Sequence, residues 1–113
     1  LCNLLFARHL ATRLPLPGQT ANAIHPGVIA TSLMRNMNPL VTIAGRLVSP
    51  ILMKTVAQGA STQTYVATHP SLSGMNGKYF ANCNEKHSSR YGRDPTLATA
   101  LWEKTQEIVE GFD

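Results

Sequence analysis

Carboxylates are absent from the first three-quarters of this 113-residue chain. Residues 1–84 contain six basic residues and no Asp or Glu, whereas residues 85–113 contain four basic and six acidic residues. Paired-carboxylate hydrolysis and carboxylate-rich metal sites need clustered acids, so both are excluded from the first part of the chain. The basic residues are scattered, with no basic run interleaved with aromatic residues. Nucleic-acid binding is therefore not expected.

Cysteines and long apolar runs are also scarce. Cys2 and Cys83 lie far apart and form no CxxC pair, so no disulfide framework is predicted and a reducing, cytoplasmic location is expected. Cys83 with His87 lacks further ligands at suitable spacing, so no metal site is expected. Arg46 interrupts the most apolar window, so no transmembrane segment is predicted. A Gly-x-Ser-x-Gly elbow and a His-Glu-x-x-His helix are both missing, which leaves hydrolase functions without support.

The composition is that of one globular domain, with 43% hydrophobic and 14% charged residues. The spacing of apolar residues predicts a helix over residues 1–14. Its apolar arc consists of Leu4, Phe6, Ala7, Leu10, Ala11 and Leu14. No capping residue precedes this helix, and Leu1, Cys2 and Leu5 make its start apolar almost all round. This pattern predicts a helix that has been cut at its start.

Residues 20–25 are predicted to form a short buried strand that runs into a functional turn. Pro26 cannot donate a hydrogen bond to a sheet, Gly27 lets another molecule approach the backbone, and Thr31 offers a hydroxyl. Ligands of open α/β sheets bind outside the carboxyl ends of parallel strands, where this turn would lie. His25 is expected to be packed or hydrogen-bonded rather than a base. The other histidines, His9, His69 and His87, are expected on the surface.

The rest of the chain predicts one adaptable segment, two helices and one strand. Residues 32–48 are apolar and Met-rich, which favours a short helix or lid. Ser49 and Pro50 are typical of a helix start, and Pro70 should end that helix. Its expected apolar stripe is Leu52, Val56, Gly59, Ala60 and Ala67.

A second strand is predicted over residues 78–82, followed by a polar loop over residues 83–93. In that loop Lys86, Arg90 and Arg93 would either lie in solvent or meet a phosphate. Asp94 and Pro95 are predicted to start the last helix. Its expected apolar stripe is Leu97, Ala98, Leu101, Trp102, Ile108, Val109 and Phe112.

The order helix, strand, lid, helix, strand, helix predicts an α/β fold with two parallel strands joined by a long crossover. Two parallel strands make a poor sheet by themselves. The chain is therefore predicted to be the end of a larger domain.

Several motifs in this order resemble the C-terminal half of a short-chain dehydrogenase/reductase, nearest to the branch of retinol dehydrogenases and WW-domain oxidoreductases. The resemblance covers essentially the whole chain. It rests on Leu1-Cys2-Asn3-Leu4-Leu5-Phe6, Asn22-Ala23-Ile24-His25-Pro26-Gly27, Gly59-Ala60 and Gly77-Lys78-Tyr79-Phe80. It implies that residues 1–113 form the C-terminal part of a Rossmann-type, doubly wound parallel sheet. The nucleotide-binding N-terminal half is then missing.

The resemblance also implies a set of cofactor-binding residues. In this family the Pro-Gly turn closes over the nicotinamide of NADP or NAD, of which the resemblance favours NADP. The positions carried over are Pro26, Gly27, Val28 and Thr31. Val28 would press on the ring, and the Thr31 hydroxyl would bond the carboxamide or the pyrophosphate.

Residues 32–53 match the variable substrate lid of the family. Its apolar side chains imply a hydrophobic small-molecule substrate such as a retinoid, steroid or fatty aldehyde, although they could instead belong to the core. The lid residues assigned to substrate are Leu33, Met34, Met37 and Leu40.

The chain departs from the family pattern because it contains neither a Gly-rich nucleotide turn nor a Tyr-x-x-x-Lys pair. The resemblance puts the catalytic Tyr and Lys directly upstream of Leu1. The full-length parent is therefore expected to be an NAD(P)-dependent oxidoreductase that interconverts an alcohol and a carbonyl, with its membrane association left open. The 113 residues alone are expected to be inactive. The alternative is a truncated interaction module that uses its first helix as a docking face, the surface through which the family builds homodimers.

Overall fold

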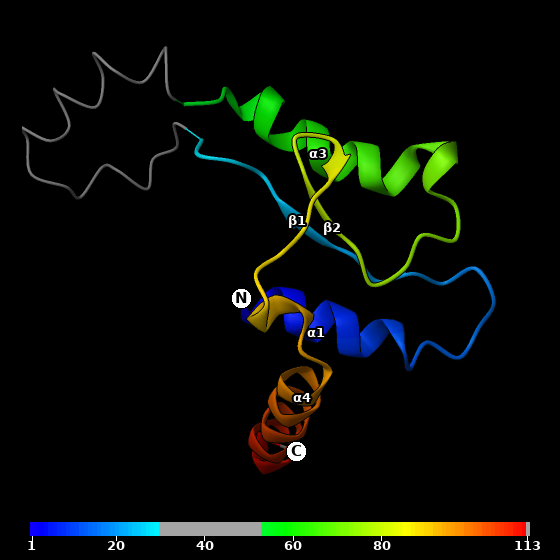
Figure 1. The fold of residues 1–113 in the computed structure, drawn as a ribbon, viewed down its shortest axis with the longest axis vertical. Coiled ribbons are helices and arrows are strands. Elements are labelled where there is room, and N and C mark those ends of the chain that lie inside the picture. Colours follow the sequence, from blue (N-terminus) through cyan, green and yellow to red (C-terminus); the bar gives the residue numbers. More distant parts are fainter. Residues whose placement is uncertain (30–52, 113) are drawn as a thin grey trace, which may run out of the picture.

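Three short strands form one sheet in the order β1-β2-β3, in the computed structural model that describes residues 1–29 and 53–112. The strands are β1 (Ala23–His25), β2 (Tyr79–Ala81) and β3 (Asn84–Glu85). The helices are α1 (Cys2–Ala11), α3 (Val56–Thr68) and α4 (Pro95–Val109), with 3-10 turns η2 (Pro70–Leu72), η3 (Tyr91–Arg93) and η4 (Glu110–Phe112). Figure 1 shows α1 and α3 on opposite sides of the sheet, with α4 beyond α1.

The predicted parallel strand pair is confirmed. β1 and β2 run parallel, with Ile24 opposite Phe80 and His25 opposite Ala81. Both strands therefore end at the same edge of the sheet. This carboxyl edge carries the Pro26 turn after β1 and the Asn82 turn after β2.

The prediction of a loop over residues 83–93 is wrong at its start. β3 pairs antiparallel with β2 through a two-residue turn, Asn82 and Cys83, whose φ angles are 53° and 56°. Two positive φ angles give the type I′ turn that matches the twist of a hairpin. The sheet is therefore mixed rather than purely parallel.

Helix α1 starts without a side-chain cap, as expected, and ends at Ala11 rather than at residue 14. Thr12 is the C-cap of the helix, and its hydroxyl donates to the His9 carbonyl at 2.7 Å. Leu4 and Leu5 are its buried residues. At the start of the helix Leu1 and Cys2 are exposed, whereas Leu5 is only 3% exposed. The docking role of this helix stays a prediction.

Helix α4 packs along α1 through an aromatic cluster. The Trp102 ring stacks on Phe6 and on His9, with ring centroids 4.8 Å and 5.0 Å away. His9 is half-buried, so its expected surface position is wrong, whereas His69 and His87 are exposed as predicted. Asp94 caps α4 as predicted, since its Oδ1 accepts from the Thr96 and Leu97 amides.

The predicted apolar stripe of α4 is buried only in part. Ala98 is buried and Leu101 half-buried, whereas the other aliphatic members and Phe112 are exposed: Leu97, Ile108, Val109 and Phe112. In Figure 1 α4 runs away from α1 toward the C-terminus, so the end of the stripe lies away from α1.

Helix α3 begins at Val56 rather than at Pro50. Thr55 is its N-cap and forms a capping box with Gln58, in which each side chain bonds the other residue's backbone N–H. Helix α3 does not extend back toward Pro50 through residues 53–55, because Lys54 pairs with Ile29 in a parallel bridge and the chain is extended up to Thr55. Ser49 and Pro50 themselves lie outside the described residues. The helix ends at Thr68, before Pro70, as predicted.

The buried side of α3 also differs from the expected stripe. Gly59 and Thr62 are its buried residues, whereas Val56, Ala60 and Ala67 are exposed. Thr62 is fully buried, and its hydroxyl accepts from the Cys83 amide at 3.2 Å. This bond fixes the β2–β3 turn to α3, beside which it lies in Figure 1.

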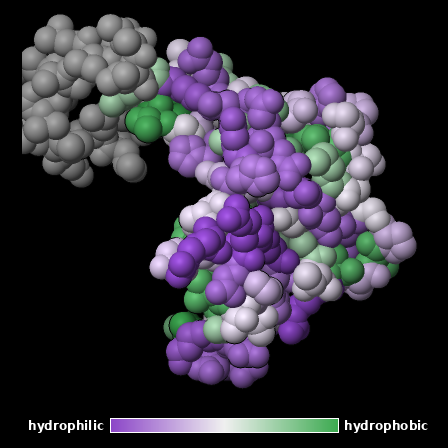
Figure 2. Space-filling model, in the orientation of Figure 1, coloured by the Kyte–Doolittle hydropathy of each residue, from purple (hydrophilic) through white to green (hydrophobic). Residues whose placement is uncertain are grey.

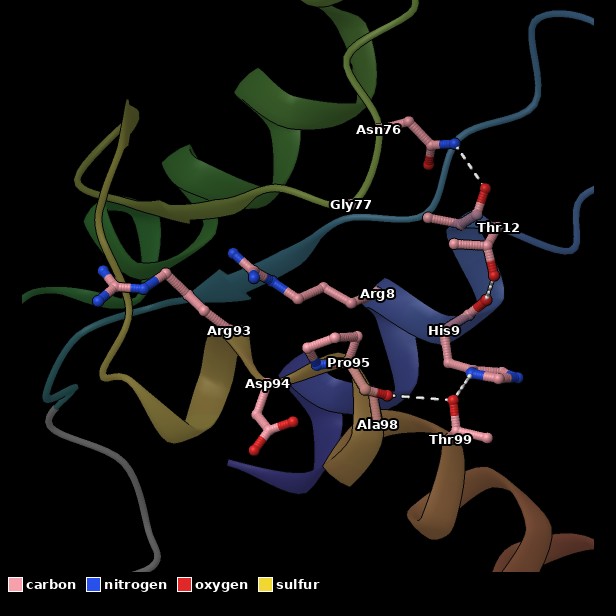
Figure 3. A pocket seen from close by; sticks show the side chains of 11 residues that line it. Arg8, His9, Thr12, Asn76, Gly77, Arg93, Asp94, Pro95, Ala98 and Thr99 are labelled. Atoms are coloured by element: carbon pink, nitrogen blue, oxygen red, sulfur yellow. Dashed lines mark hydrogen bonds between the residues drawn. The ribbon is translucent and has the colours of Figure 1, made fainter.

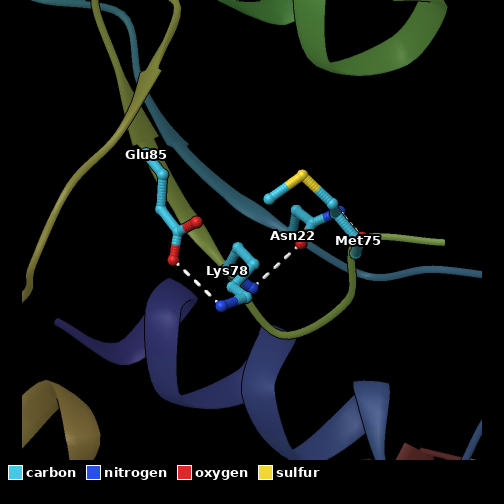
Figure 4. Close-up of polar contacts among 4 residues, drawn as sticks. All are labelled: Asn22, Met75, Lys78 and Glu85. Carbon is cyan, nitrogen blue, oxygen red and sulfur yellow. Dashed lines mark hydrogen bonds and ion pairs between the residues drawn. The ribbon is translucent and has the colours of Figure 1, made fainter. Parts of the chain in front are cut away.

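Asparagine side chains connect the segment before β1 to the segment before β2. Asn22 donates to the Met75 carbonyl at 2.7 Å and accepts from the Lys78 amide at 2.9 Å (Figure 4). Lys78 also pairs with Glu85 across β2 and β3 at 3.0 Å. The Asn22 bonds set the parallel register, and the exposed ion pair adds little.

Phe80, on the middle strand, is the largest buried side chain of the described residues. The face of the molecule shown in Figure 2 is mostly hydrophilic, with small hydrophobic patches near the edges of the view. The described part of the chain is therefore an α/β unit with one small core around β2.

Candidate functional site

The Pro26–Gly27 turn leaves the sheet directly after β1, at the carboxyl edge shared with β2. Gly27 has a φ of +88°, which an L side chain rarely adopts, so glycine is required for this backbone path. The side chain of Val28 is 63% exposed and offers an apolar surface beside the turn. Three of the four predicted cofactor residues therefore lie together at the edge where open α/β sheets bind ligands.

His25 holds the turn through a local hydrogen bond. The Gly27 amide donates to Nδ1 of His25 at 2.9 Å, and the His25 side chain is exposed. The prediction of a hydrogen-bonded histidine is confirmed. Because Nδ1 accepts this bond, the ring is in the tautomer with its proton on Nε2.

Replacing His25 with leucine is expected to lower the free energy of unfolding by about 0.5–1 kcal/mol, because the Gly27 N–H loses its acceptor. His25→Asn should keep most of the stability, since an asparagine side-chain oxygen also accepts from the backbone N–H two residues on. Urea denaturation and hydrogen exchange at the Gly27 amide measure both effects. Equal exchange in the two variants would contradict this role of the imidazole.

Two residues that the sequence did not single out complete the site. Lys54 donates from its backbone N–H to the Val28 carbonyl at 2.8 Å, and its Nζ donates to Oδ1 of Asn82 at 2.6 Å. The Lys54 side chain passes over Gly27, where a Cβ would lie 2.9 Å from its Cδ. Lys54 thus joins the end of β1 to the end of β2. The only signal in the sequence was that Lys54 is one of two lysines in the acid-free stretch of residues 1–84.

Helix α3 packs directly on the chain that follows the turn. A Cβ placed on Gly59 would lie 2.2 Å from Cδ1 of Ile29, so the helix can approach only because residue 59 has no side chain. The turn is therefore held by α3 on one side and by Lys54 above Gly27.

Comparison with known proteins gives one consistent group of relatives. The chain is 40% identical to short-chain dehydrogenase TIC 32 A, chloroplastic, of Brassica napus over 114 residues, which cover 99% of this chain and 35% of that protein. It is 37% identical to human retinol dehydrogenase 14 over 96% of the chain and 33% of the relative. It is also 37% identical to the WW domain-containing oxidoreductase of Danio rerio, over 97% of this chain and 26% of that protein. No family model matches the chain.

The chain belongs to the short-chain dehydrogenase/reductase family. This confirms the resemblance drawn from the motifs and makes the fold a Rossmann-type α/β fold. The chain spans about a third of the length of the curated relatives it matches.

Part of the site predicted for this short-chain dehydrogenase/reductase chain lies outside the described residues. These positions are Thr31, the lid segment 32–52, and with it Leu33, Met34, Met37 and Leu40. Their cofactor and substrate roles stay predictions.

A pocket of about 480 Å³ lies apart from the turn, between α1, Gly77 and the start of α4 (Figure 3). Arg8 and Arg93 line it, and the Nε of Arg8 is buried without a hydrogen-bond partner among the described residues. The Arg93 guanidinium points away from the other labelled side chains, and the Asp94 carboxylate caps α4. The two guanidinium groups thus do not converge on one ligand position.

The polar loop before α4 lies in solvent. Lys86, Arg90 and Arg93 are exposed, and the Arg90 guanidinium lies over the Tyr91 ring at 4.9 Å from its centroid. Within residues 1–29 and 53–112, no three His, Cys, Asp or Glu side chains gather into a group that could bind a metal ion. None of the helices described there has both the length and the apolar character needed to cross a bilayer.

Proposed function

We propose that this chain is the C-terminal part of an NAD(P)-dependent oxidoreductase that interconverts an alcohol and a carbonyl on a hydrophobic substrate. The observation that carries this proposal is the Pro26–Gly27 turn at the shared carboxyl edge of β1 and β2. In open α/β sheets this edge is where nucleotides bind. Relatives named retinol dehydrogenase and oxidoreductase support the same chemistry.

The Pro26–Gly27 turn and the adjoining Val28 are suited to contact one face of a nicotinamide ring. Gly27 permits the positive φ that the backbone of the turn requires, and the exposed Val28 side chain can cover one face of a flat ring. The bound nicotinamide supplies or accepts the hydride. Thr31 is assigned to its carboxamide or to the pyrophosphate, and NADP is favoured over NAD.

The chain itself supplies no proton-transfer residues, because no tyrosine in it has a lysine four positions later. We place the catalytic Tyr and Lys directly upstream of Leu1. Sequencing the transcript upstream of the Leu1 codon tests this placement. A stop codon there would contradict it, and so would measurable dehydrogenase activity of the purified 113-residue chain.

Changing Gly27 to alanine in the full-length protein is expected to raise the KM for the dinucleotide about ten-fold, equivalent to about 1.4 kcal/mol. The new Cβ strains the backbone at φ +88° and lies 2.9 Å from Cδ of Lys54. Gly18→Ala is the matched control, since Gly18 has a φ of +83° and nothing within 4 Å of an added Cβ. Steady-state kinetics with varied dinucleotide measure both variants. An equal KM in the two would contradict the assignment of the turn.

The substrate is proposed to be a retinoid, steroid or fatty aldehyde held under the lid of residues 32–53. We place the full-length protein in the cytoplasm, with membrane association decided by its remaining residues. Flotation of the full-length protein with lipid vesicles distinguishes a free protein from a membrane-associated one.

A further inference from the structure

We propose that Lys54 is a positioning residue that holds the cofactor-closing turn in place through Asn82. The inference rests on the proposed function, because it assigns the turn to a dinucleotide. Lys54 and Asn82, joined by a hydrogen bond, form a pair that we call the latch. Neither residue belongs to the motifs that relate the chain to its family.

The latch acts on the turn through both the backbone and the side chain of Lys54. The Lys54 amide donates to the Val28 carbonyl at 2.8 Å, which fixes the chain just after the turn. The side chain then lies across Gly27, with Cδ, Cε and Nζ at 2.9, 3.0 and 3.2 Å from the position of a Gly27 Cβ. Because Gly27 has no side chain, the methylene groups of Lys54 can occupy the space beside it.

Asn82 is a fixed anchor for the ammonium group. It is the first residue of the type I′ turn after β2, and the next residue, Cys83, donates from its amide to the buried hydroxyl of Thr62. The Lys54 Nζ donates to Oδ1 of Asn82 at 2.6 Å, a charge-assisted hydrogen bond. The latch therefore connects the ends of both parallel strands to α3.

Lys54 takes part in neither ion pair of the described residues, which join Lys78 to Glu85 and Lys104 to Glu107. Its hydrogen-bond partner Asn82 is a neutral side chain at the carboxyl edge. A positive charge at this place attracts an anionic dinucleotide.

Hydrogen exchange in the full-length protein tests whether the latch holds the turn. Lys54→Met keeps the apolar stem and removes the ammonium, and Asn82→Ala removes its acceptor. Both are expected to raise exchange about five-fold at the amides of Gly27 and of residue 54, which donate to His25 Nδ1 and to the Val28 carbonyl, as loss of one hydrogen bond of about 1 kcal/mol would do. Lys78→Met is the control, because it breaks an exposed ion pair at the other end of β2. Unchanged exchange in the two latch variants would overturn the proposal.

Kinetics with NADP and NAD test whether the latch positions the turn for the cofactor. Both latch variants should raise the KM for the dinucleotide about five-fold and leave kcat nearly unchanged, and Lys54→Arg should restore the KM. Raised exchange with an unchanged KM would overturn the positioning role. A wild-type protein that binds neither dinucleotide would contradict the proposed function instead, and the exchange result would then decide alone whether the latch holds the turn.

Discussion

Replacing Phe80 with alanine is expected to lower the free energy of unfolding by about 3–5 kcal/mol. Phe80 is 1% exposed and lies on the middle strand, where it is paired with both Ile24 and Glu85. Removing its ring leaves a cavity that strands of two and three residues cannot close without losing their register. Urea denaturation followed by circular dichroism measures the change.

Phe112→Ala is the matched control for this prediction, since Phe112 is 85% exposed and should change stability by less than about 0.5 kcal/mol. If Phe80→Ala does not fold, Phe80→Leu keeps the test open, with an expected loss of about 1–1.5 kcal/mol. Equal unfolding midpoints for the Phe80 and Phe112 variants would show that β2 is not the centre of the core.

Elements with a local start signal could be predicted from the sequence. Asp94 and Pro95 mark the start of α4, and the long crossover between the two strand candidates correctly gave their parallel pairing. β3 was missed because it is only two residues long and its turn, Asn82-Cys83, lacks the glycine that usually marks a type I′ hairpin.

The start of α3 combines a local signal with a contact distant in sequence. Thr55 with Gln58 is typical of a helix start. Lys54 pairs with Ile29, a contact that no local pattern contains, and this pairing keeps the chain extended up to Thr55. The capping box and the distant pairing together place the first turn of α3 at Val56.

The site likewise combines residues that are neighbours in the sequence with residues that only the fold brings together. Pro26, Gly27 and Val28 adjoin one another in the sequence, so their turn could be predicted from it. Lys54 and Asn82 are 28 residues apart, and nothing in the sequence brings them together. Two long-range features place them there: Lys54 pairs with Ile29 beyond the end of β1, and Asn82 follows β2, which runs parallel to β1.

Replacing Gly59 with valine is expected to lower the free energy of unfolding by about 1–3 kcal/mol, the cost of overpacking a close contact. The new Cβ would lie 2.2 Å from Cδ1 and 2.8 Å from Cγ1 of Ile29, so one of the two segments must move. Ala60→Val, one position on and exposed, is the control for helix propensity and should cost about 0.5 kcal/mol. Urea denaturation of both variants gives the comparison.

A double-mutant cycle with Ile29→Ala identifies the contact that causes this loss. Shortening Ile29 removes both atoms that a Gly59 Cβ would meet most closely, so Gly59→Val should cost less than about 0.5 kcal/mol in that background. A loss that persists there would mean that α3 is fixed by other contacts. Because Ile29 is two residues beyond Gly27, the cycle also reports how tightly the helix holds the turn. A rescue by Ile29→Ala would therefore place the close approach of α3 among the forces that shape the cofactor edge.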